Sequence, residues 1–458
     1  MSKHESLDVR VAVEADNPAL VRNESLCVNC SMCRQVCEDY IGVHGHYDLS
    51  KTADKAICIH CGQCINVCPT GSLFSRNEYK QVQEAIDDPN QIVVVSTSPA
   101  VRVALAEAFG LEAGRFEEEK MVGLLRMLGA DYVLDTNFAA DLTIMEEASE
   151  LVERVTKHTA PLPQFTSCCP AWVKYAEIFH PEVLPNISSA KSPIGMQGAT
   201  VKTYFARENG LEAKNIVHVA LAPCTAKKFE VRREEFNSSG RFHGDESIRD
   251  TDFVITTVEL AEWAQARGIN FNDIQSSHYD RLMGEGSGAG VIFGATGGVM
   301  EAALRSAYFL TTGENPSPDA FREVRDDGTI SPLPWREATF ELAGRTVRCA
   351  VASGLGNARQ LLHSLQRREV HYEFVEIMAC PGGCAGGGGQ PVDGTDREKA
   401  ADRGKVLFRL DQNAPLRFSH ENPAVQALYR EYLDEPCSHR AEELLHCDHF
   451  AWQMNASR

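Results

Sequence analysis

Two short runs of cysteine near the N-terminus constrain this 458-residue chain more than any other feature of its sequence. Both runs share the spacing C-x2-C-x2-C-x3-C, and they comprise Cys27, Cys30, Cys33 and Cys37, then Cys58, Cys61, Cys64 and Cys68 followed by Pro69. Gaps of two residues let three thiolates converge on one cubane from a tight loop, and in such a duplication the fourth cysteine ligates the other cluster. We therefore expect two 4Fe–4S clusters, one on Cys27, Cys30, Cys33 and Cys68, the other on Cys58, Cys61, Cys64 and Cys37.

Zinc is the main alternative for these cysteines, because paired CxxC motifs also build zinc sites. The third and fourth cysteine of each run, together with the duplication itself, favour iron–sulfur clusters. His60, inside the second run, is expected to be a spectator because thiolates already fill the four positions. We therefore interpret residues 27–85 as a ferredoxin-like domain that transfers single electrons, preceded by a leader at residues 1–26.

The composition, 43% hydrophobic and 24% charged, indicates a globular chain able to bury a sizeable core. No stretch approaches the ~18 apolar residues of a membrane helix, and the N-terminus lacks the apolar core of a secretory signal. We therefore expect a cytoplasmic protein with no membrane contact, whose 16 cysteines serve metal binding or catalysis rather than disulfides. A formal charge of −19 argues against a nucleic-acid partner.

Past residue 85 the pattern of the sequence changes. Apolar runs such as IVVV (92–95) and YVLD (132–135) alternate with helical stretches such as LTIMEEASELVERV (142–155). Strand and helix in alternation predict an α/β fold, α+β overall, with parallel or mixed sheets flanked by helices.

A second set of cysteines lies in this region, in three short motifs. They read TSCCPAW (166–172), PCTAKKFE (223–230) and MACPGGCAGGGGQP (378–391). Their cysteines could ligate one further cubane that the tertiary fold assembles, on Cys169, Cys224, Cys380 and Cys384. The glycine run after Cys384 would let the backbone approach a bulky inorganic group closely. It lacks the lysine and Ser/Thr of a phosphate-binding P-loop.

These motifs resemble the three signature segments of FeFe-hydrogenases, in the same order, and the resemblance extends from about residue 25 to about residue 450. It implies reversible conversion of H2 to protons and electrons, with heterolytic cleavage at a diiron subsite. That subsite would carry CO, CN and azadithiolate ligands and be bridged by Cys380 to a 4Fe–4S cluster on the four cysteines. The resemblance also implies a catalytic domain at residues 86–410 and, at residues 411–458, a helical C-terminal wrap like the family's small subunit. The protein is expected to be a monomer. Its expected partners are diiron maturation proteins and, for electron transfer, ferredoxin or flavodoxin.

The same resemblance assigns roles to residues around the diiron subsite. Cys168 would pass protons, which a thiol can do because its pKa is tunable. Glu147, Glu150 and Arg154 share one face of the predicted helix, and the family's proton path would run through them and Ser188. From spacing alone, a solvated charged face is the simpler interpretation. Further residues would contact the cofactor: Lys227 as a donor to cyanide, with Pro99, Phe293 and Met378 around it.

Three positions depart from the usual family pattern. Ser98 stands where alanine is usual, Ala222 where methionine is usual, and Ile194 where glutamine is common. Each changes packing or hydrogen bonding beside the predicted diiron ligands, and such partners tune metal centres. Catalytic bias, rate and oxygen tolerance are therefore open.

The remaining cysteines have other interpretations. Cys349 is expected to be a small buried apolar residue. Cys437 and Cys447, with His439, His446 and His449 nearby, match no zinc-finger spacing, so a zinc site is the less favoured interpretation. Two rival functions remain: a hydrogen sensor, which would tend to lose Cys168 and gain a signalling domain, and a cluster carrier or assembly protein.

Overall fold

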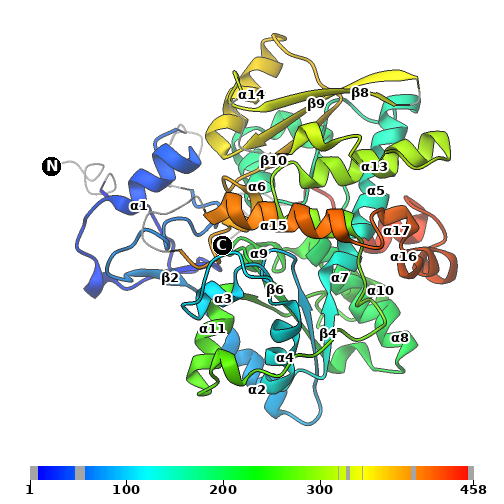
Figure 1. The fold of residues 1–458 in the computed structure, drawn as a ribbon. Helices are drawn as coiled ribbons and strands as arrows, with labels where there is room; N and C mark the ends of the chain where they lie inside the picture. The colour runs from blue at the N-terminus through cyan, green and yellow to red at the C-terminus, as the bar shows by residue number, and fades with distance from the viewer. Residues whose placement is uncertain are drawn as a thin grey trace.

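The computed structural model describes residues 9–46, 57–317, 319–325, 331–342, 344–392 and 399–451. Figure 1 shows the N-terminal region, in blue, at one side of a larger unit that contains two sheets. In this region strand β1 (Leu20–Arg22) pairs antiparallel with β2 (Leu73–Ser75), so part of the predicted leader is joined to the ferredoxin-like segment. The helix here is α1 (Met32–Gln35), which continues as a π-helical turn to Ile41, whereas the next helix, α2 (Tyr79–Asp87), packs in the larger unit through Val82.

The first sheet of the larger unit is fully parallel, with strand order β4-β3-β6-β7. Its strands are β3 (Ile92–Thr97), β4 (Tyr132–Asp135), β6 (Ile216–Ala222) and β7 (Phe253–Thr256). Side chains alternate between faces, so Val93 and Val95 pack under one helical layer while Val94 packs under the other. The first layer contains α3 (Leu105–Ala108), α4 (Glu118–Leu128) and α11 (Thr257–Ala266).

The second sheet is mixed, with strand order β5-β10-β9-β8. It consists of β5 (Gln164–Phe165), β8 (Arg336–Leu342), β9 (Arg345–Ser353) and β10 (Phe374–Met378), and only the β8–β9 pair is antiparallel. Helix α13 (Gly298–Thr312) covers one face, whereas α6 (Pro170–Phe179) and α14 (Leu355–Gln366) cover the other. Cys349 is fully buried in β9, so its expected position in the core is confirmed.

Helix α5 (Thr136–Lys157) lies between the two sheets, as Figure 1 shows. It begins with a side-chain cap, in which the Asp135 carboxylate accepts a hydrogen bond of 2.9 Å from the backbone N–H of Asn137. Its first thirteen residues are buried, including the acidic residues Asp141, Glu146 and Glu147. Carboxyl groups buried this deeply need hydrogen-bond partners or a proton.

The remaining helices connect and wrap these layers. They are α7 (Pro193–Thr200), α8 (Ala206–Glu208), α9 (Lys227–Glu230), α10 (Ser238–His243), α12 (Gly288–Val291), α15 (Lys399–Asn413), α16 (Pro423–Leu428) and α17 (His439–Leu445). Leu433 and Leu444 of the C-terminal segment pack with Phe138 and Leu142 of α5. The predicted fold class is confirmed, including the parallel and mixed sheets and the short helical wrap.

Within the described part of the chain, no helix combines the length and the apolar character that a membrane span requires.

Candidate active site

The four cysteines of the second set meet at the ends of three elements. Cys169 immediately precedes α6, Cys224 follows β6, and Cys380 and Cys384 follow β10. Burial raises the pKa of Cys224 to about 11, and the nearby Cys169 thiolate adds to this effect. The pKa of Cys380 is raised by burial and then by Cys224 and Cys169. Four thiols that form no disulfide therefore converge in a site where water does little to stabilise a thiolate. Four cysteine thiolates are the ligands of a 4Fe–4S cluster.

The glycine run after Cys384 lets its backbone pack directly against the backbone of two other segments. A Cβ atom on Gly387 would lie 2.2 Å from the carbonyl oxygen of Pro223, and one on Gly388 would lie 2.0 Å from that of Cys61. Gln63 donates a hydrogen bond of 2.7 Å from Nε2 to the Gly386 carbonyl oxygen. The second cysteine run of the ferredoxin-like region thus lies directly against the four-cysteine site.

The cysteines of the two N-terminal runs are also close to each other. Burial raises the pKa of Cys37 to about 12, with contributions from Cys58 and Cys33. Cys64 has Cys58, Cys37 and Cys33 as charged neighbours, so Cys37 lies among the thiols of the second run. The crossed ligand assignment requires this placement of Cys37.

Beside the four cysteines lies a pocket with about 510 Å³ of empty space. Its lining includes most of the residues predicted to surround a cofactor, namely Ser98, Pro99, Cys168, Ile194, Ala222, Cys224, Lys227, Phe293 and Cys384. Met378 is not in this lining, but it packs in one apolar cluster with Cys168 and Phe293.

Lys227 points its ammonium group into the buried environment next to Cys168. Its Nζ donates to the Cys168 carbonyl oxygen at 3.1 Å and to the Glu230 carboxylate at 3.0 and 2.8 Å. Burial lowers the pKa of Lys227, yet the net shift is upward because Glu230 stabilises the charged form. Ser192 donates a further hydrogen bond of 2.8 Å to Glu230, which fixes the ion pair. The pocket therefore has a fixed ammonium group at its edge, whose charge Glu230 balances.

Glu147 lies on α5, deep behind Cys168. One carboxylate oxygen accepts a hydrogen bond of 3.3 Å from the backbone N–H of Ser167, and the other has no hydrogen-bond partner among the residues that the structure describes. Burial, followed by repulsion from Glu150, raises the pKa of Glu147 to about 8. A carboxyl group that titrates near neutral pH can both accept and release protons.

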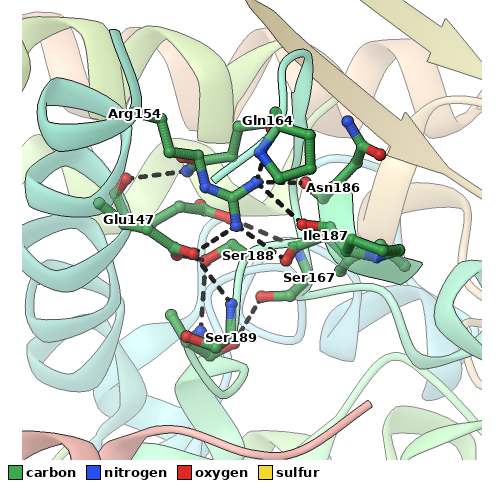
Figure 2. A network of polar contacts seen from close by, with 12 residues as sticks. Glu147, Arg154, Gln164, Ser167, Asn186, Ile187, Ser188 and Ser189 are labelled. Carbon is green, nitrogen blue, oxygen red and sulfur yellow. Dashed lines mark hydrogen bonds and ion pairs between the residues drawn. The ribbon is translucent and has the colours of Figure 1, made fainter. Parts of the chain in front are cut away.

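One turn further along α5, Glu150 connects the buried region to the surface. Ser188 donates a hydrogen bond of 2.5 Å from Oγ to Oε2 of Glu150, and Arg154 donates one of 2.5 Å to Oε1. Figure 2 shows the Arg154 guanidinium surrounded by backbone carbonyl oxygens, among them those of Asn186 at 2.9 Å and Ile187 at 3.1 Å. The Glu150 side chain is 16% exposed, whereas that of Arg154 is 3% exposed. The solvated charged face suggested by spacing alone is therefore wrong for Arg154, which is buried and anchors Glu150.

The side chains of the predicted proton path form two separate hydrogen-bonded groups. Ser188 and Glu150 are bonded to each other, whereas the free oxygen of Glu147 has no direct hydrogen bond to either within the described residues. A proton that crosses between the sections needs a side-chain rotation or a bridging water.

Comparisons with known proteins agree with this arrangement. A model of the iron-only hydrogenase large subunit, C-terminal domain, matches residues 91–388. A model of the iron hydrogenase small subunit matches residues 397–452, and a 4Fe-4S binding domain matches residues 52–74. The chain belongs to the iron-only hydrogenase family.

Several relatives of this hydrogenase family are similar over most of the chain. The NADP-reducing hydrogenase subunit HndD of Solidesulfovibrio fructosivorans is 42% identical, over 95% of this chain and 68% of that protein. Iron hydrogenase 1 of Clostridium pasteurianum is 40% identical, over 95% of this chain and 76% of that protein. A solved structure of apo [FeFe]-hydrogenase from Chlamydomonas reinhardtii has a TM-score of 0.72 and 42% identity, over 81% of this chain and 98% of the other. The prediction of a hydrogenase, and hence of an oxidoreductase with iron–sulfur clusters and an H-cluster, is confirmed.

The family also has relatives with another role. Cytosolic iron-sulfur assembly component 3 of Mus musculus is 32% identical, over 82% of this chain and 78% of that protein. The similarity is lower than that to the hydrogenases, but it shows that this fold is shared with an assembly component.

Some residues of this hydrogenase site escaped the sequence analysis. Glu230 was visible as the last residue of PCTAKKFE, three positions after Lys227, although its role as partner of the ammonium was not predicted. Ser192 and Ser167 gave no signal, since a serine before a proline or a cysteine is common in loops. Only the fold places them next to the buried charges.

Proposed function

We propose that this chain catalyses reversible oxidation of H2 to two protons and two electrons. The observation that supports this function best is the pocket beside the four converging cysteines, which brings together Cys168, Lys227 and Phe293 from distant parts of the sequence. When bound, a diiron group with CO, CN and azadithiolate ligands would supply the chemistry of heterolytic H2 cleavage.

In this proposal the chain's own residues bind and orient the cofactor. Cys169, Cys224, Cys380 and Cys384 would hold a 4Fe–4S cluster, and Cys380 would also hold the diiron group. Lys227 is held by Glu230 and the Cys168 carbonyl oxygen beside the pocket, and donation to an anionic cyanide ligand would replace one of these three hydrogen bonds.

Protons and electrons leave the proposed site in different directions. Cys168 exchanges protons with the pocket, and Glu147, Ser188 and Glu150, anchored by Arg154, relay them along α5 to the surface. Two clusters held by the ferredoxin-like region would carry the electrons, and its second cysteine run lies against the four-cysteine site at Gly388. Ferredoxin or flavodoxin is the proposed external electron partner.

The remaining features of the proposal follow the sequence analysis. Residues 27–85 form the electron-transfer domain, residues 86–410 the catalytic domain and residues 411–458 the C-terminal segment. The protein acts as a cytoplasmic monomer and receives its diiron group from maturation proteins.

The experiment that tests this function is a hydrogen assay in both directions after installation of the diiron group, together with infrared spectroscopy. Carbonyl and cyanide bands with turnover in either direction support an enzyme. The same bands with negligible turnover would favour the hydrogen sensor, and absence of the bands after installation would favour a cluster carrier or assembly protein.

We expect the chain produced without diiron maturation proteins to contain three 4Fe–4S clusters, about twelve iron atoms, because thiolates alone can ligate cubanes. Iron analysis and electron paramagnetic resonance measure this number. The matched variant is Cys384→Ser, for which we expect about eight iron atoms. An unchanged iron content in that variant would contradict the assignment of Cys384.

We expect Ser98→Ala combined with Ala222→Met to shift the carbonyl and cyanide infrared bands and to change the ratio of hydrogen oxidation to evolution. Both side chains line the pocket, where Ser98 adds a hydroxyl and Ala222 leaves space that methionine would fill. Infrared spectroscopy and film voltammetry on wild type and double variant measure the effect. Superimposable spectra with an unchanged ratio would show that Ser98 and Ala222 do not affect the irons.

A further inference from the structure

The C-terminal segment and helix α5 meet in a cluster of three metal-ligating side chains that the proposed reaction does not use. Glu146 comes from α5, Cys437 from the loop before α17, and His446 from the residue after α17. Their ligating atoms all lie within 4.8 Å of one another. Glu146 is separated from the other two by about 290 residues of sequence, so no spacing pattern could have revealed the set.

Hydrogen bonds already join the three residues, and the thiol of Cys437 donates to the backbone carbonyl oxygen of Glu146 at 3.8 Å. Oε2 of Glu146 lies 3.0 Å from Nε2 of His446 and accepts a hydrogen bond of 2.7 Å from the backbone N–H of Cys437. Tyr429 donates a hydrogen bond of 2.5 Å from its hydroxyl group to Oε1. Glu146 is fully buried, so its charge needs compensation.

His446 is held in the orientation that a metal ligand needs. Its Nδ1 lies 2.8 Å from Oγ of Ser189, and its backbone forms an antiparallel bridge with Ala190. A partner on Nδ1 leaves Nε2 for the metal, and such partners orient ligating histidines in metal sites.

The surroundings of Cys437 favour a cation. Burial, together with the carboxylates of Glu146, Glu150 and Glu153, raises the pKa of the thiol. A divalent cation would lower the pKa of the Cys437 thiol again, because its positive charge stabilises both the thiolate and the neighbouring carboxylates.

We propose that Glu146, Cys437 and His446 bind one zinc ion, with water as the fourth ligand. One thiolate, one imidazole and one carboxylate are ligands that zinc accepts in tetrahedral sites, at about 2.3, 2.0 and 2.0 Å. On binding, the one proton of the neutral imidazole lies on Nδ1 and is donated to Ser189 Oγ, which leaves Nε2 for zinc, and the thiol proton of Cys437 is released to solvent. The alternative is a purely hydrogen-bonded latch that attaches the C-terminal segment to α5.

The test uses the full-length chain with its iron–sulfur clusters loaded, so that the cluster cysteines are occupied. After incubation with one equivalent of zinc and desalting, elemental analysis gives the zinc content and X-ray absorption at the zinc edge gives the ligands. We expect one zinc per chain, with a single sulfur at about 2.3 Å and nitrogen or oxygen at about 2.0 Å.

Matched variants identify the site. We expect Cys437→Ser and His446→Gln each to weaken zinc binding more than 100-fold, and Ser189→Ala to weaken it about 10–100-fold by releasing the ring. His439→Gln, at an exposed histidine on the same segment, and Cys447→Ser should bind zinc like wild type. Circular dichroism and iron content show whether each variant is folded.

Three results would overturn the zinc site. They are a wild-type chain that retains no zinc, a zinc spectrum with more than one sulfur ligand, and undiminished binding in both Cys437→Ser and His446→Gln. The wild-type measurement decides the question even where a variant is unstable.

Discussion

Replacement of Cys168 by alanine is expected to lower hydrogen turnover by about 10²–10⁴-fold while the iron content stays unchanged. Cys168 is adjacent to Cys169 but is additional to the four converging thiols, and it lines the pocket. Its thiol has Glu147 and Lys227 as charged neighbours, which places it between the pocket and the acidic residues of α5. Removal of this thiol should therefore interrupt proton transfer rather than cluster assembly.

Two further variants separate proton transfer from packing. Cys168→Ser keeps the shape of the side chain, but a hydroxyl group does not release a proton at working pH, so we expect a similar loss. Cys349→Ala is the matched control, because it also removes a thiol from a buried position, in β9, but away from the pocket. This variant should retain turnover. Hydrogen assays and iron analysis on the three variants measure these effects. Turnover above about half of wild type in Cys168→Ala would mean that protons take another route.

The sequence predicted the parts of this molecule that depend on residue type and local spacing. The cysteine runs and the alternation of strands and helices were visible as local patterns, whereas the residues expected around the pocket followed from the resemblance to FeFe-hydrogenases. Spacing also placed Glu147, Glu150 and Arg154 on one face of a helix. It could not give their burial, because α5 has a mixed polar sequence and is enclosed only after both sheets and the C-terminal segment pack around it.

Interactions between distant segments were beyond the reach of the sequence. The orientation of Arg154 depends on carbonyl oxygens of residues 161 and 185–187, which come from loops after α5. The same is true of Glu146, whose partners Tyr429, Cys437 and His446 lie near the other end of the chain. The C-terminal segment also bonds directly to the loop that contains Ser188, since His449 lies 2.7 Å from the Ser188 carbonyl oxygen. These contacts arise from tertiary packing and leave no local signal.

Replacement of Glu147 by glutamine is expected to lower turnover by about 10²–10⁴-fold and at the same time to stabilise the fold above pH 8. The pKa of Glu147 is raised from 4.5 to about 8 in the folded chain, mainly by burial. The native state therefore keeps a proton that the unfolded chain has released, and stability is lost as pH rises between these two values. Above pH 8 the loss is on the order of 5 kcal/mol, at about 1.4 kcal/mol per pKa unit.

Glutamine removes this loss because it is always neutral and can still accept the hydrogen bond from the Ser167 N–H. Its amide replaces an oxygen that has no partner, so relative to protonated Glu147 the change in free energy is small. Asp141→Asn, on the same helix, is the contrasting control. Asp141 accepts hydrogen bonds from Ser287, Ser419 and Asn422, so its replacement should destabilise the fold by about 1–3 kcal/mol.

Calorimetric unfolding at pH 5.0 and pH 9.0, with film voltammetry on the same samples, measures both effects. We expect Glu147→Gln to unfold at the same temperature as wild type at about pH 5 and several degrees higher at about pH 9. Wild-type hydrogen evolution should fall as pH passes through about 8, where Glu147 loses its proton. A variant that is less stable than wild type at high pH, or that retains full turnover, would show that Glu147 is an ordinary buried carboxyl group with another proton donor in its place.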